Sequence, residues 1–120
     1  MENVIIEFFR GDTYSRNFSI SGWNKEITKV YFTVKENTEN KQYVLQKRYG
    51  EGISLLEENN GTITYNITID STDTDDLKTG FDYEFDIEIH SPGTTTIPIK
   101  KTVITGIFKL KPSATRTCNE

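Results

Sequence analysis

The pattern in this sequence with the clearest chemical potential is a row of acidic residues at alternate positions. The row consists of Asp82, Glu84, Asp86 and Glu88. Pairs of carboxylates perform general acid–base catalysis when one holds a proton and the other accepts one. Four carboxylates on one exposed strand face, however, repel each other. We therefore interpret the row as a solvated face that pairs with a strand at 28–35, where Lys29 and Lys35 form cross-strand ion pairs with it.

No other group of residues in the sequence builds a catalytic or metal site. His90 is the only histidine, so it has no second His to share a metal ion. Asp73, Asp75 and Asp76 are clustered as a calcium site requires, but the regular loop with a glycine and a distal Glu is absent, and turn formation explains them better. No nucleophile–base set or phosphate-binding loop is present. The sequence predicts no catalytic residue, no metal and no cofactor, and hence a protein that is not an enzyme.

The tripeptide Arg10-Gly11-Asp12 matches the integrin-binding motif. It lies directly between two expected strands, where Gly-Asp makes a bend. Short motifs match by chance often, so we interpret it as a turn.

The element that must organise the chain is a strand at 81–89. Its apolar residues share one parity, as a half-buried strand requires: Phe81, Tyr83, Phe85, Ile87 and Ile89. The start of this strand resembles the tyrosine corner of immunoglobulin-like sandwiches, because it shows the same spacing of Leu77, Gly80 and Tyr83. We expect the Tyr83 hydroxyl to bond to backbone near Leu77.

The remaining sequence alternates in the same way, with turn residues at regular spacing, and predicts about seven or eight strands. The predicted fold is all-β, an immunoglobulin-like antiparallel β-sandwich, with one domain over 1–112 and a flexible tail over 113–120. Asn60-Gly61 predicts a hairpin turn, and 71–78 is the one candidate for a helical turn. The expected inter-sheet core consists of Phe32, Ile67, Phe85, Ile87 and Phe108.

Composition excludes several classes of partner. The net charge of −4 and the pI near 5.1 argue against nucleic-acid binding, which needs a positive face. Cys118 is the only cysteine and cannot form an internal disulfide. No run approaches 18 apolar residues and no signal peptide is recognisable, so we expect no membrane span and synthesis in a cytosol.

Motifs distributed over nearly the whole chain resemble a bacteriophage or prophage structural module, the N-terminal domain of siphophage baseplate upper proteins. They are Arg10-Gly11-Asp12-Thr13, Ile27-Thr28, Val30-Tyr31-Phe32-Thr33-Val34-Lys35, Gly61, Ile67-Thr68-Ile69, Asp73-Thr74, Leu77, Gly80, Tyr83-Glu84-Phe85-Asp86-Ile87 and Gly106-Ile107-Phe108. The sequence departs from the family at Ser21-Gly22-Trp23-Asn24, where an Asp-Gly hairpin followed by a proline is usual.

This resemblance implies a non-catalytic virion subunit of the tail or baseplate, made in the bacterial host cytoplasm. It implies other tail proteins as partners and homo-oligomers within the assembly. The alternative is a carbohydrate- or host-surface-binding module. The candidate partner contacts are Trp23, Tyr31 and Tyr49. Trp23 is equally well explained as a lid over the end of the core.

Overall fold

The computed structural model describes residues 3–23, 26–37, 39, 41–92 and 99–112. Eight strands form one sheet in the order β1-β8-β7-β3-β4-β5-β6-β2. Their bounds are β1 Asn3–Phe9, β2 Tyr14–Ser21, β3 Lys29–Lys35, β4 Leu45–Tyr49, β5 Gly52–Asn59, β6 Thr62–Ile69, β7 Tyr83–Ser91 and β8 Ile99–Lys111. The all-β prediction is confirmed. The predicted tail, with Cys118, lies outside the described residues.

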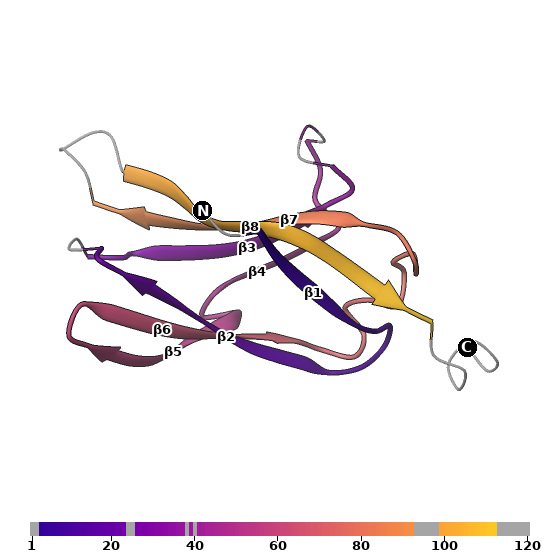
Figure 1. The fold of residues 1–120 in the computed structure, drawn as a ribbon, viewed down its shortest axis with the longest axis horizontal. Coiled ribbons are helices and arrows are strands. Elements are labelled where there is room, and N and C mark those ends of the chain that lie inside the picture. The colour runs from indigo at the N-terminus through magenta and orange to yellow at the C-terminus, as the bar shows by residue number, and fades with distance from the viewer. Residues whose placement is uncertain (1–2, 24–25, 38, 40, 93–98, 113–120) are drawn as a thin grey trace.

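The sheet folds over itself into two layers and comes close to a barrel. Figure 1 shows β8, β7 and β3 in one layer and β5, β6 and β2 in the other, with β1 crossing between them. The chain extends 53 × 31 × 24 Å. Inward side chains from both layers therefore meet along the length of the molecule.

The core follows the predicted strand parity. Successive residues of β7 alternate between buried and half-buried, as do those of β6. The five predicted core residues are all buried in one cluster: Phe32, Ile67, Phe85, Ile87 and Phe108. The ring centroids of Phe32 and Phe85 lie 5.3 Å apart, and the rings of Phe8 and Phe108 are nearly perpendicular with centroids 5.6 Å apart.

The turns are partly as predicted. Asn60 and Gly61 both have positive φ (52° and 80°) between Asn59 and Thr62, which are paired. This is the backbone of a two-residue hairpin, whose twist matches that of the flanking strands. The helical turn predicted at 71–78 is wrong. The segment forms successive turns instead, in one of which the N–H of Leu77 donates to the backbone carbonyl oxygen of Thr74.

The prediction of a purely antiparallel sheet is also wrong, because β1 pairs with β8 in parallel. The first strand joins the last strand of the chain, and both run in the same direction. A short parallel pairing also links β4 and β5 where the chain changes layers. The sheet is therefore mixed.

Gly106 permits the β1–β8 pairing. It lies in the middle of β8, opposite Val4 on β1 and Phe85 on β7. A Cβ at this position would lie 1.8 Å from the Val4 carbonyl oxygen and 2.8 Å from the Phe85 ring. Any side chain larger than hydrogen must therefore displace β1 or Phe85.

We predict that Gly106→Ala lowers the free energy of unfolding by about 3 kcal/mol, the upper range for overpacking, because both obstacles are backbone or core groups. Equilibrium urea unfolding followed by Trp23 fluorescence measures the change. Thr105→Ala, on the opposite face of the same strand, is the control and should cost less than about 1 kcal/mol. Equal effects of the two substitutions would contradict the close approach of β1.

Candidate functional site

The two edge strands of the sheet, β1 and β2, face each other, and among the described residues no ladder of backbone hydrogen bonds joins them. β1 and β2 stand at opposite ends of the strand order although they follow each other in the chain. β1 covers only 105–111 of β8, so over 99–104 that strand is paired with β7 alone in the described part of the chain. We call the opening between β1 and β8 on one side and β2 on the other the seam.

The floor of the seam is apolar. A cavity of about 210 Å³ opens there. Its lining comes from five strands: Val4, Ile6, Arg16, Asn17, Phe18, Ser19, Ile67, Phe85, Ile87 and Ile104. Seven of these ten residues are apolar, and they belong to the core cluster or pack against it.

One polar contact spans the narrow end of the seam. Arg16 Nη1 donates to the carbonyl oxygen of Ile5 at 3.2 Å. Arg16 shares the parity of Tyr14 and Phe18 but is exposed, and a charge on an edge strand hinders pairing with other chains. Arg16 was not among the predicted site residues, although a charge within an apolar alternation is the signal that could have found it.

At the wide end of the seam, the facing edges of β2 and β8 have no strand partner among the described residues. A depression of about 310 Å³ lies between the end of β2 and the start of β8. It is lined by Ser19, Ile20, Ser21, Lys101, Thr102, Val103 and Ile104. Lys100 and Lys101 are exposed beside it. This geometry can accept an added strand from another protein segment. The apolar side chains of that strand would lie on the floor of the seam, and its acidic groups would lie near the two lysines.

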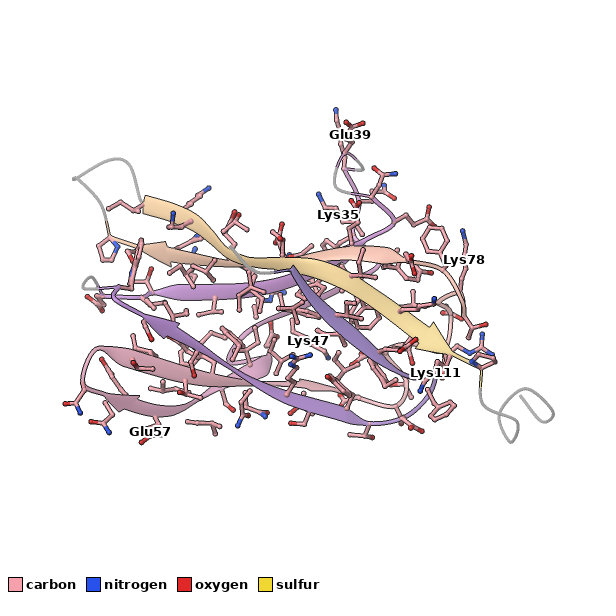
Figure 2. The ribbon with its side chains drawn as sticks, viewed as in Figure 1. Lys35, Glu39, Lys47, Glu57, Lys78 and Lys111 are labelled. Atoms are coloured by element: carbon pink, nitrogen blue, oxygen red, sulfur yellow. The ribbon has the colours of Figure 1, made fainter. Side chains whose placement is uncertain are left out.

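A second surface lies on the outer face of β7, β3 and β4. The predicted pairing of 28–35 with the acidic strand is confirmed: Lys35 lies opposite Glu84 and Tyr31 opposite Glu88. Lys29, however, lies opposite His90, so the acidic partner predicted for it is wrong. Figure 2 shows Lys35 on the same side of the layer as the loop that carries Glu39.

Asp86 is the carboxyl group on this face whose pKa is perturbed. Partial burial raises the pKa of its carboxyl group, and the neighbouring charge of Glu88 raises it further, while Lys35 lowers it. The acidic row therefore carries one carboxylate whose negative charge is disfavoured by its surroundings. The side chain of Glu88 also accepts a hydrogen bond from the ring of His90, whose Nε2 is 2.7 Å from Glu88 Oε1.

The structure separates the three candidate contact residues. Tyr31 and Tyr49 line one depression of about 280 Å³ beside β3 and β4. Trp23 is elsewhere, packed against the core, and its Nε1 donates to the hydroxyl of fully buried Ser91 at 3.0 Å. This is the arrangement expected of a lid over the end of the core.

The corner residues are brought together as predicted. Tyr83 is 1% exposed, and its hydroxyl accepts a hydrogen bond from the backbone N–H of Lys78 at 2.8 Å. Leu77 is buried next to that N–H. The N–H of Gly80 donates to the carbonyl oxygen of Leu110 at 2.8 Å, which ties the corner to the last strand.

The Arg10-Gly11-Asp12 turn docks onto this corner. Arg10 Nη1 donates to the carbonyl oxygen of Leu77 at 3.3 Å, and the N–H of buried Gly11 donates to the hydroxyl of Thr74 at 2.8 Å. The motif thus makes internal contacts, in agreement with its interpretation as a turn.

The acidic residues near the corner also have internal roles. Asp73 Oδ2 accepts a hydrogen bond from the N–H of Asp70 and forms an ion pair with Lys47, both at 2.7 Å. Among the described residues, no group of three His, Cys, Asp or Glu side chains is placed to hold a metal ion.

Comparisons with known proteins add no relative: the sequence matches no family model, and no curated protein is significantly similar to it. Within the described residues, the structure has no helix with the length and apolar character needed to cross a membrane.

We predict that Asp86→Asn stabilises the protein at pH 7 by roughly 0.5 kcal/mol, the scale of a solvent-screened charge effect. The pKa of the Asp86 carboxyl group is raised in the folded state, so between pH 3.8 and that pKa the native state binds more protons than the unfolded state. The free energy of unfolding therefore falls as the pH rises through this window. The advantage of Asn should therefore vanish below about pH 3.8.

Urea unfolding of both proteins at pH 7 and pH 3.5 measures this difference. Glu57→Gln, which removes an exposed carboxylate from β5, controls for the loss of one negative charge. A variant less stable than the wild type at pH 7 would contradict the assignment.

Proposed function

We propose that this chain is a non-catalytic structural subunit of a phage or prophage virion, associated with the tail or baseplate, and that it acts by protein–protein assembly. The observation that carries the proposal is the seam, where two strand edges flank an apolar floor. Sheet edges of this kind bind extended segments of other proteins by adding a strand. The motifs resembling baseplate upper proteins support the same conclusion.

The occupant of the seam is an extended segment of a neighbouring virion subunit. Its inward residues are apolar, because they face Ile20, Val103 and Ile104. Its flanks are acidic, because Lys100 and Lys101 are exposed at the rim. The same lysines disfavour direct pairing with the identical edge of a second copy, since like charges would meet.

The finer fold assignment belongs to this proposal as well. The buried Tyr83 and its hydrogen bond to Lys78 support an immunoglobulin-like sandwich in which β1 has joined β8. A rigid two-layer module with an open seam is suited to repeated lateral contacts in a symmetric assembly.

We predict that Val103→Lys lowers incorporation of the chain into particles at least about tenfold, because a charge on the apolar floor must be desolvated when a strand covers it. Tagged variants are expressed in a culture that produces the phage, and quantitative mass spectrometry of purified particles measures incorporation. Thr105→Lys, where β1 already covers the edge of β8, is the matched control. Thermal unfolding verifies that both variants fold.

Two outcomes contradict the proposal in different ways. Absence of the wild-type chain from purified particles overturns the virion function. Incorporation of Val103→Lys at the wild-type level overturns the seam as the contact surface.

A further inference from the structure

A groove of about 360 Å³ crosses the outer face of the sheet, on the side away from the core. Strands β3, β4 and β7 and the segment before β4 contribute its lining: Tyr31, Thr33, Lys35, Lys41, Tyr43, Gln46, Asp86, Glu88 and His90. Its volume lies within the range of small-ligand sites. None of these residues is needed for the proposed contact at the seam.

Aromatic rings provide flat apolar surface in this groove. The Tyr31 ring lies against His90, with centroids 5.1 Å apart. Tyr43 is 54% exposed and lines the same groove. Exposed tyrosines give a large contact area at a low entropy cost, since each has only two side-chain torsions to fix.

Fixed polar groups surround the rings. The ring of His90 donates to Glu88, and Gln46 Nε2 donates to the Thr33 hydroxyl at 3.0 Å. These bonds hold the side chains in place, while the carboxylates retain further acceptor positions and the Gln46 amide retains a donor and an acceptor. Asp86 adds a half-buried carboxyl group.

The charges of the groove balance. Two lysines, Lys35 and Lys41, face two carboxylates, Asp86 and Glu88, so the formal charge of the lining is zero when His90 is neutral. A polyanion such as nucleic acid requires an excess of positive charge. A neutral ligand rich in hydroxyl groups, by contrast, can use donors and acceptors of both signs.

We propose that this groove binds a neutral pyranose-containing saccharide. The C–H face of the sugar ring packs on Tyr31 or Tyr43, and its hydroxyl groups donate to Asp86 and Glu88 and accept from the lysines. Both features are needed together, because the aromatic face recognises the ring and the polar groups orient it.

The site extends along β3 to a second unit. Tyr31 lines both this groove and the neighbouring depression of about 280 Å³, whose lining also includes Arg48 and Tyr49, and the Tyr49 ring rests against core Tyr65 with centroids 6.0 Å apart. Tyr49 is 50% exposed. The ligand is therefore an oligosaccharide of at least two sugar units, with Tyr31 between them.

Isothermal titration calorimetry of the purified chain tests the proposal. The probes are neutral oligosaccharides (maltotriose, cellotriose, lactose and chitotriose), a neutral polysaccharide purified from the host cell surface, and sialyllactose and a sugar phosphate as charged comparisons. We expect saturable binding of at least one neutral probe, with a Kd on the order of 1 mM or below. The free oligosaccharides and the host polysaccharide distinguish the two sources of the same chemistry.

The variants separate binding from folding. Tyr31→Ala and Glu88→Gln should each weaken binding at least about tenfold, because the first removes the stacking surface and the second removes a charged acceptor. Phe9→Ala, which removes an exposed ring on β1 outside the groove, should bind as the wild type does. Melting temperatures establish that each variant is folded.

Three results would overturn the proposal. They are no saturation by any neutral probe up to about 10 mM, binding of the charged probes alone, and unchanged binding by a folded Tyr31→Ala variant. Incorporation into particles is measured separately, so the failure of this proposal leaves the assembly proposal standing, and the reverse holds as well.

Discussion

The structure depends on how closely β1 approaches β8. Gly106 has no side chain, so the carbonyl oxygen of Val4 and the ring of Phe85 can both occupy the space that a Cβ would need. This contact fixes the first strand to the last in parallel. Among the described residues β1 spans seven and β8 spans thirteen, so 99–104 of β8 have no β1 partner there. The seam follows directly from that mismatch in length.

Closing the barrel would require a ladder between β1 and β2; in its place the described residues show a side-chain hydrogen bond from Arg16 to the carbonyl oxygen of Ile5. Within the described residues, the chain thus retains two strand edges over apolar side chains, with charges on them only from Arg16 on β2 and from Lys100 and Lys101 on β8. Such an edge is a risk for aggregation in an isolated protein and an advantage for a subunit that acts in an assembly. The polar outer face, with Tyr31 at its centre, is independent of this edge and remains accessible when the seam is filled.

Much of the fold could be predicted from the sequence because burial follows a period of two. The parity of Phe32, Phe85 and Phe108 and the backbone bond of Tyr83 depend on local patterns and spacing, and these are as expected. The alternation of apolar and polar residues in a strand predicts which face is buried, but it does not specify which other strand pairs with it. The parallel pairing of β1 with β8 and the uncovered half of β8 were therefore missed.

The candidate sites were predictable to a smaller extent for the same reason. Tyr31 was singled out as an exposed aromatic residue, but its neighbours depend on the register between β3 and β7, which places Glu88 opposite Tyr31. Tyr43 and Gln46 join them only because β4 pairs with β3. Trp23 was left between two roles, and its bond to Ser91 depends on a segment 68 residues away.

Native-state hydrogen exchange tests the open seam most directly. In the isolated chain, amides that face the seam in 15–21 and 99–104 should exchange at least about tenfold faster than those of β3 and β7, which are paired on both sides. Once the chain is incorporated into particles, the same amides should become protected. Equal protection of the seam and of β3 and β7 in the isolated chain would show that the barrel is closed, and would contradict this account.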